Sequence, residues 1–116
     1  MTPTHVAKPW GHEVIWAHVP GHYVGKFLHV NPGQRLSTQY HERKHETMTL
    51  VSGDATVYIK TDEGVFRNNP LSYGPVDIPP GTVHWIGTTG GCVICEVSTD
   101  DLDDVVRIYD PYKKQR

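Results

Sequence analysis

Short stretches of alternating apolar and polar residues recur along the whole 116-residue chain, and no window of useful length carries an apolar period of 3.6 residues. Alternation is typical of half-buried strands, and turn-forming segments such as NPGQ, SGD, TDEG, PPGT and TGG interrupt it. We therefore predict an all-β chain, with strands at 12–17, 22–30, 36–41, 46–52, 55–60, 64–67, 76–79, 83–89, 92–98 and 105–110.

Strands this short and this numerous would leave unpaired edges in an open sheet. A closed barrel or a two-sheet sandwich removes most of those edges, so we expect that architecture. The length suits one domain with one core, and we assign it to residues 1–116. Within that domain we expect residues 1–11 to form an N-terminal arm and residues 111–116 a frayed tail.

The overall charge narrows the possible partners. A formal net charge of −2 gives no electrostatic reason to expect nucleic acid or an anionic membrane surface. The opening residues MTPTHVAKPW lack the apolar core of a signal peptide, and no apolar run approaches the roughly 18 residues of a membrane span. We therefore expect a cytoplasmic protein that binds neither nucleic acid nor membrane.

Four potential metal ligands lie in the segment QYHERKHE: Gln39, His41, His45 and Glu46. Side chains two apart on a strand share a face, so Gln39 and His41 can point to one place. Glu46 starts the next strand in phase with its apolar face, where a carboxylate needs a partner and a metal supplies one. The same parity turns His45 to the other side and excludes it.

A second histidine comes from a distant strand. His84 follows the turn PPG and is in phase with Ile86, so it also points inward. The predicted metal ligands are therefore Gln39, His41, Glu46 and His84, a nitrogen and oxygen set that suits one Zn, Mn, Fe, Co or Ni ion. The alternative is that the residues of QYHERKHE are polar surface residues on an edge hairpin.

The same positions resemble two metal motifs of the cupin superfamily: Gly33, Gln39, His41, Glu46 and Gly53, and then Pro79, Gly81 and His84. Glutamine in place of the first histidine resembles the phosphomannose isomerases. The segments KPWG, VNPGQRLSTQYH, LVSGDATV, IPPGTVH and EVSTDDLDDVVRIYDPY are similar, in order, to the C-terminal isomerase domain of bifunctional mannose-1-phosphate guanylyltransferase/mannose-6-phosphate isomerase. The resemblance implies a cupin β-barrel, a double-stranded β-helix of the jelly-roll type.

The chain departs from that family next to its metal motif. HERKHETM stands where the family has HHHRAEHW, which retains His41 and Glu46 but replaces two histidines by Glu42 and Arg43. The His-Trp pair after the glutamate is replaced by Thr-Met. We therefore expect the walls around the substrate to differ from those of the family.

The resemblance implies a metal-dependent aldose-ketose isomerase. Its substrate would be a sugar phosphate such as mannose 6-phosphate or fructose 6-phosphate, or, in a related enzyme, another sugar. Glu46 and Lys26 are the candidate catalytic residues, because Lys26 puts an ammonium on an apolar inward face; the other interpretation is that Lys26 extends to the rim. Lys26, Arg35 and Arg107 are the candidate substrate-binding residues, and parity through the predicted strand places Arg35 on the face of Gln39 and His41. Arg107 is instead a salt-bridge partner of Asp103 or Asp104 in the simpler interpretation.

The resemblance also implies a homodimer. Two other functions remain open at this point. His41, Glu46 and His84 form the two-histidine, one-carboxylate set of Fe(II)-dependent oxygenases. A non-catalytic, metal-containing sugar-binding or regulatory module is the third possibility, and the altered HERKHETM segment favours it.

Overall fold

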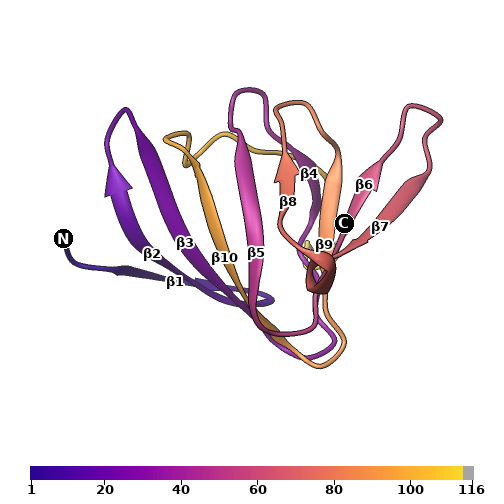
Figure 1. Cartoon of the computed structure of the whole chain (residues 1–116), viewed down its shortest axis with the longest axis horizontal. Coiled ribbons are helices and arrows are strands. Elements are labelled where there is room, and N and C mark those ends of the chain that lie inside the picture. Colours follow the sequence, from indigo (N-terminus) through magenta and orange to yellow (C-terminus); the bar gives the residue numbers. More distant parts are fainter. Residues whose placement is uncertain (114–116) are drawn as a thin grey trace.

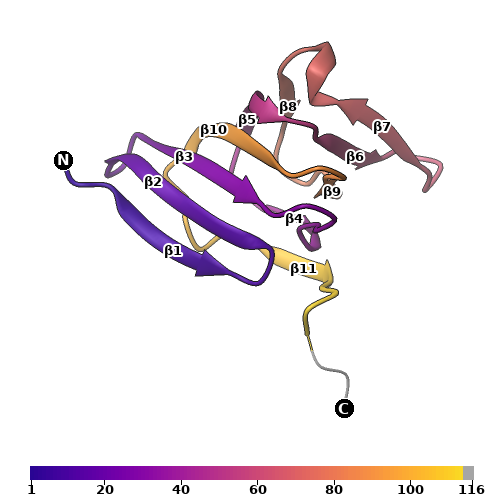
Figure 2. The same cartoon turned by 90° about the horizontal axis from the view of Figure 1, so that it is seen from below.

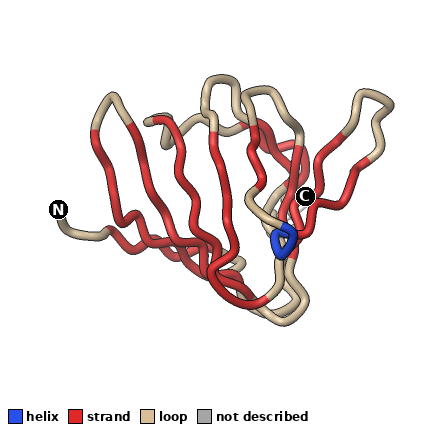
Figure 3. Tube along the Cα trace, in the orientation of Figure 1, coloured by secondary structure: helices blue, strands red, loops and turns tan. Residues whose placement is uncertain are grey.

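The computed structural model describes residues 1–113, and these are mostly strand (Figure 3). The single helical element among them is the 3-10 turn η1 (Leu71–Tyr73), and no helix in this part of the chain is long and apolar enough to cross a membrane. The strands are β1 (Thr4–Lys8), β2 (Gly11–Val19), β3 (Tyr23–Val30), β4 (Thr38–Tyr40), β5 (Glu46–Gly53), β6 (Thr56–Lys60), β7 (Phe66–Pro70), β8 (Val76–Ile78), β9 (His84–Gly87), β10 (Cys92–Thr99) and β11 (Val106–Tyr109).

The all-β prediction is confirmed. Every strand predicted from the alternation overlaps an observed one, because most of the turn residues that end the predicted strands also end the real ones; β7 instead continues through residues 68–70, where the strand was expected to have ended. The strand β1 was not predicted, because residues 1–11 were expected to form an arm. It pairs antiparallel with β2, from Thr4 opposite Ile15 to Lys8 opposite Gly11.

The strands form two antiparallel sheets. One has the order β1-β2-β3-β10-β5-β8, and the other has the order β11-β4-β9-β6-β7. Figure 1 shows β1, β2, β3, β10 and β5 of the first sheet on the left, β8 at its right-hand end, and β4, β9, β6 and β7 on the right. Figure 2 shows the arrangement from below, with β11 close to the turn that joins β1 and β2. Because neighbours such as β3 and β10 are far apart in sequence, the fold depends on long-range pairing.

The core lies between the sheets and follows the period of two. Along β10, Cys92, Ile94, Glu96 and Ser98 are buried while the residues between them are more exposed. Leu28, Val30, Met48 and Ile94 of the first sheet pack in one cluster with Val57, Ile86 and others of the second sheet. Apolar burial of this kind, roughly 1.5–3 kcal/mol for each large aliphatic side chain, holds the sheets face to face.

Both chain ends are more integrated than the sequence indicated. Trp10 is buried in the core of its own chain. Near the other end, Tyr112 packs against the same core, and its hydroxyl donates to the side-chain oxygen of Gln34 at 2.6 Å. The frayed-tail prediction is therefore wrong for Tyr112, because its ring and hydroxyl have partners, while residues 114–116 lie outside the described residues.

Candidate metal centre

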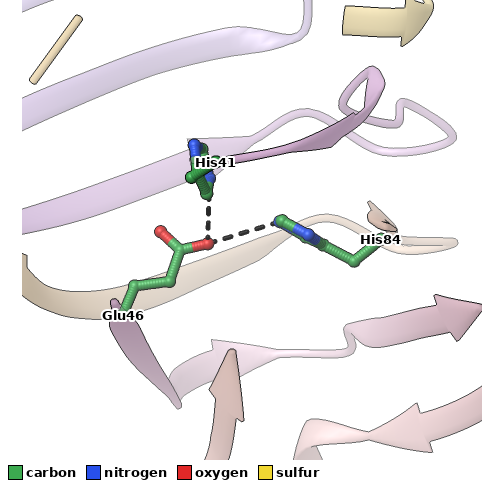
Figure 4. A group of neighbouring side chains, drawn as sticks. All are labelled: His41, Glu46 and His84. Carbon is green, nitrogen blue, oxygen red and sulfur yellow. Dashed lines mark ion pairs between the residues drawn. The ribbon is translucent and has the colours of Figure 1, made fainter. Parts of the chain in front are cut away.

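Three side chains from separate strands converge inside the molecule (Figure 4). His41 follows β4, Glu46 begins β5 and His84 begins β9, and all three are buried. Glu46 Oε1 lies 3.4 Å from His41 Nε2 and 3.3 Å from His84 Nε2. The structure thus brings together three of the four predicted ligands, with one candidate ligand atom from each lying within 4.8 Å of the others.

The hydrogen bonds of the two imidazoles determine what faces this point. His41 Nδ1 bonds to the carbonyl oxygen of Asp104, and His84 Nδ1 bonds to that of Thr82 at 2.9 Å. A carbonyl only accepts, so each Nδ1 carries the proton, and in a neutral ring Nε2 is then a lone-pair acceptor. With neutral rings, both Nε2 atoms therefore present a lone pair to the centre, as a metal ligand must.

Three acceptor atoms consequently point at one another without a proton between them. His41 Nε2, His84 Nε2 and Glu46 Oε1 are buried and have no hydrogen-bond partner within residues 1–113. The Glu46 carboxylate is ionised although it is buried, because its other oxygen, Oε2, lies 2.9 Å from the ammonium of Lys44. Buried acceptors left in this way are costly, and a cation satisfies all three at once. The donor set fits a divalent metal ion.

The loop that carries His41 is held by Asp104, which precedes β11. The Asp104 carboxylate accepts backbone N–H groups of Glu42, Arg43 and Lys44 at 3.1, 2.7 and 2.9 Å. Burial acts to raise the pKa of Asp104, but these amide donors lower it to about 2. One residue therefore positions both the loop, through its carboxylate, and the imidazole of His41, through its carbonyl.

The turn between β8 and β9 holds the same loop. The backbone N–H of Gly81 donates to the carbonyl of His41 at 2.7 Å. Gly81 has a φ of 81°, in the left-handed region that glycine adopts without strain. The PPG turn before His84 is thus tied directly to the other imidazole ligand.

Behind Glu46 lies a buried ammonium. Lys44 Nζ is 2.9 Å from Glu46 Oε2 and 3.4 Å from Glu96 Oε2. Although burial opposes it, the two carboxylates raise the pKa of Lys44 above its usual range. Burial and the charge of Glu46 raise the pKa of Glu96 to about 7. The carboxylate that faces the imidazoles is therefore anchored from the other side by an ion pair.

Sequence reasoning missed both of these residues. Glu96 had a detectable signal, because it is in phase with the inward Cys92 and Ile94 on a predicted strand. Lys44 had none, because it lies in the loop between β4 and β5, where strand parity says nothing about direction.

Gln39 lies beside the three converging side chains. It is on β4 with His84 of β9 as its Cα partner, so the two side chains share the inner face. Its side-chain oxygen accepts a hydrogen bond from Ser37 Oγ at 2.8 Å. Its role as a metal ligand stays a prediction.

A cavity of about 350 Å³ opens next to the centre. It lies between β2, β3 and β10 on one side and β4 and β11 on the other, and its walls include Lys26, Gln39, His41 and Arg107. Lys26 points inward as predicted, is buried, and places Nζ 3.5 Å from Glu13 Oε2. The volume is at the small end of ligand-binding pockets, which suits a small metabolite.

Arg107 faces the mouth of this cavity. It is the Cα partner of Gln39 across β11 and β4, and it is exposed. Within the described part of the chain no carboxylate lies at ion-pair distance from it, and the Asp104 carboxylate is taken by the amides of the 42–44 loop. The salt bridge to Asp103 or Asp104 that the sequence offered as an alternative is not formed.

Arg35 does not share the ligand face. Its guanidinium carbon lies 3.9 Å from the ring centroid of Trp85 and 5.3 Å from that of Tyr109, and it donates to Thr38 Oγ1 at 2.7 Å. The prediction failed because parity was carried through residues 36 and 37, where the chain is not in a strand. Trp85 alternates with the inward His84, so Arg35 lies on the outer face of that sheet.

Comparison with known proteins extends over nearly the whole chain. The family described as mannose-6-phosphate isomerase C-terminal matches residues 1–110. The alginate biosynthesis protein AlgA of Pseudomonas aeruginosa is 31% identical over 92% of this chain, and the mannose-1-phosphate guanylyltransferase of Escherichia coli K12 is 34% identical over 92%. The chain spans 22% of the length of each of these relatives.

Solved structures show the same fold. CapF, in complex with 3-isopropenyl-tropolone, superposes with a TM-score of 0.76 at 19% identity, covering 93% of this chain and 35% of CapF. Oxalate decarboxylase of Bacillus subtilis, a protein with Mn(II) centres, superposes with a TM-score of 0.73 at 14% identity, covering 91% of this chain and 30% of that one. These likenesses confirm the predicted cupin fold.

Proposed function

Because the chain belongs to the mannose-6-phosphate isomerase C-terminal family, we propose that it is a metal-dependent aldose-ketose isomerase acting on a sugar phosphate. We take mannose 6-phosphate and fructose 6-phosphate as the first substrates to test. The observation that carries the proposal is the group of three buried acceptors, His41 Nε2, His84 Nε2 and Glu46 Oε1, beside a cavity of metabolite size.

The proposed metal ligands are His41, Glu46 and His84, with Gln39 as the fourth. One carboxylate among neutral ligands leaves a divalent ion with net positive charge, and such an ion polarises a carbonyl as a Lewis acid. Isomerisation moves one proton between C1 and C2 and one between the two oxygens. The residues of the chain must therefore orient the sugar and carry a proton on the cavity side of the centre.

Lys26 is the proposed proton donor to the sugar oxygen, because an ammonium can give a proton to oxygen but cannot take one from carbon. Its ammonium lies in the cavity wall, and the Glu13 carboxylate on the neighbouring strand holds it there at 3.5 Å. Arg107 is the proposed phosphate ligand, because a guanidinium binds a phosphate through two parallel hydrogen bonds. Gln39 lies between the strand of Arg107 and the strand of His84, so a sugar phosphate anchored at Arg107 would extend over β4.

Proton exchange tests the proposal. Metal-loaded protein, incubated with each sugar phosphate in deuterated water, should exchange the C2 proton of mannose 6-phosphate or a C1 proton of fructose 6-phosphate, as followed by NMR. Lys26→Met should lower the exchange rate by about 100-fold or more, while Lys60→Met, at an exposed lysine of β6 outside the cavity lining, should change it little. No exchange by the metal-loaded protein with either compound would reject this assignment.

An Fe(II)-dependent oxygenase is the second candidate. The observation that favours it is that Gln39 is bonded to Ser37, which leaves the two-histidine, one-carboxylate set of such enzymes. Oxygen consumption by the Fe(II)-loaded protein with candidate sugars, together with no deuterium exchange, would support this function over the first. Sugar binding without either reaction would support a binding module.

A further inference from the structure

Lys26 leaves one role of the proposed reaction open. Isomerisation takes a proton from C2 of the aldose and adds one to C1 of the ketose, and an ammonium has no lone pair with which to accept a proton from carbon. Within residues 1–113, the cavity wall offers carboxylates as proton acceptors, besides the imidazole of the proposed ligand His41. These carboxylates are those of Glu13, Glu96, Asp104 and Asp110.

Two of these carboxylates are bound to the backbone. Asp104 accepts the three amides of the 42–44 loop at 2.7 to 3.1 Å and keeps that loop in place. Asp110 accepts the backbone N–H of Tyr112 at 3.0 Å. It follows β11 and lies past the end of β4 that is opposite to His41. Neither carboxylate is therefore well placed for a sugar carbon beside the metal ligands.

A third carboxylate belongs to the ion pairs of the core. Glu96 Oε2 lies 3.4 Å from Lys44 Nζ, and the same ammonium lies 2.9 Å from Glu46 Oε2. The other oxygen of Glu46 is the one that faces the imidazoles. Glu96 therefore balances the charge of Lys44 behind the centre.

The fourth carboxylate, that of Glu13, is held more loosely. Its Oε1 lies 3.8 Å from Lys8 Nζ and its Oε2 lies 3.5 Å from Lys26 Nζ. Close charge-assisted hydrogen bonds measure about 2.7–2.9 Å. Glu13 is the Cα partner of Leu28, another residue of the cavity wall, and its side chain is buried on the inner face of β2. Its oxygens thus keep lone pairs that can accept a proton in the cavity.

We propose that Glu13 is the base that acts on carbon, a proposal that rests on the isomerase function proposed above. As Glu13 takes the proton from C2, the C2–H electron pair forms the C1–C2 double bond, and O1 takes a proton from Lys26. The enediol then returns its O2 proton to the Lys26 amine, and C1 takes the proton from the Glu13 carboxyl group. The ketose is formed, and both side chains regain their starting protonation states.

The arrangement of the two residues suits this pair of transfers. C1 and C2 are bonded to the oxygens that gain and lose protons, so the base on carbon and the donor to oxygen must lie side by side. Glu13 and Lys26 come from the adjacent strands β2 and β3, and their charged atoms are 3.5 Å apart in one wall of the cavity. One ion pair therefore supplies both partners of the reaction.

Deuterium exchange at carbon tests the assignment. Glu13→Gln retains an amide oxygen that can accept from Lys26 but cannot take a proton from carbon, so it should lower the exchange rate by about 100-fold or more. Its metal content and its affinity for the sugar phosphate should stay close to those of the wild type. Glu63→Gln, at an exposed carboxylate in the turn between β6 and β7, is the matched control and should change the rate little.

Chemical rescue separates a base from a residue that only positions Lys26. In Glu13→Ala, added formate should restore the exchange rate by about 10-fold or more, because it supplies a carboxylate base. Chloride at the same concentration supplies the negative charge but is too weak a base, so it should restore almost nothing. Equal melting temperatures of the Glu13 variants and the wild type show that the variants are folded.

The possible failures differ. Exchange by the wild type that persists nearly unchanged in Glu13→Gln, or rescue by chloride as effective as rescue by formate, would overturn the role of Glu13 and leave the isomerase function standing. No exchange by the metal-loaded wild type would reject the isomerase function and the base together.

Discussion

Lys44 Nζ lies 2.9 Å from Glu46 Oε2, while Glu46 Oε1 faces the two imidazoles of His41 and His84. The two oxygens of one buried carboxylate therefore have different partners. One is held by an ammonium, and the other stays available to a cation. This division connects the ion pairs of the core to the geometry of the candidate metal centre.

Removal of that ammonium should destabilise the fold. Lys44→Met leaves Glu46 and Glu96 buried without their shared cation, and breaking a buried ion pair costs about 3–5 kcal/mol. The exposed pair of Arg43 with Asp101 supplies the control, because Arg43→Met should cost about 1 kcal/mol or less. Urea unfolding of the metal-free proteins measures both, and similar losses would contradict the role given to Lys44.

The Asp104 clamp should make stability fall in acid. Its pKa is about 2 in the folded protein against a usual 3.8, so its contribution is complete above about pH 4 and disappears as the pH falls toward 2. Asp104→Asn removes this titration, so the free energy of unfolding should fall less between pH 4 and pH 2 than in the wild type. Urea unfolding across that range checks it, with Asp62→Asn, in the turn before β7, expected to behave as the wild type.

Substitution of the two arginines predicted to bind substrate should have different effects on KM. Arg107→Met should raise KM for a sugar phosphate by about 10-fold or more, because a charge-assisted phosphate contact is lost. Arg35→Met should leave KM unchanged, since its guanidinium is stacked on Trp85 at the outer face. The measurement is steady-state kinetics on both variants, and a reversed order would place the phosphate elsewhere.

Substitutions at Gln39 and Ser37 test whether Gln39 is the fourth metal ligand. If its amide turns from Ser37 to the metal, Gln39→Leu should weaken metal binding by about 10-fold, less than the loss of a charged ligand. Ser37→Ala removes the competing hydrogen bond and should not weaken binding. Titration with Zn²⁺ or Mn²⁺ distinguishes the two, and unchanged affinity in Gln39→Leu would remove Gln39 from the ligand set.

Strand parity is why much of this centre could be predicted. Glu46, His84 and Lys26 lie on strands that alternate regularly. Strand parity therefore predicted correctly that their side chains point inward. Arg35 was misplaced because the count crossed a stretch that is not a strand. Lys44 and Asp104 could not be found, because both lie outside the strands, where parity gives no direction, and each has a partner 50 or more residues away along the chain.

The extra strand β1 has a similar cause. Its residues THVAK alternate only weakly, and their place in the sheet depends on the turn at Pro9 and Trp10 and on pairing with β2. Burial of Trp10 in the core was not readable from its neighbours, since an aromatic residue in a turn segment is compatible with either surface or core.

Metal stoichiometry tests the central claim most directly. Untagged protein, stripped of metal and dialysed against Zn²⁺ or Mn²⁺, should retain about one ion per chain, as for a mononuclear site. Glu46→Gln and His84→Ala should each abolish that retention, whereas alanine at both His12 and His29, whose rings stack 4.3 Å apart away from the centre, should not. Retention equal to that of the wild type in Glu46→Gln and His84→Ala, or loss only with the His12 and His29 pair, would contradict the account.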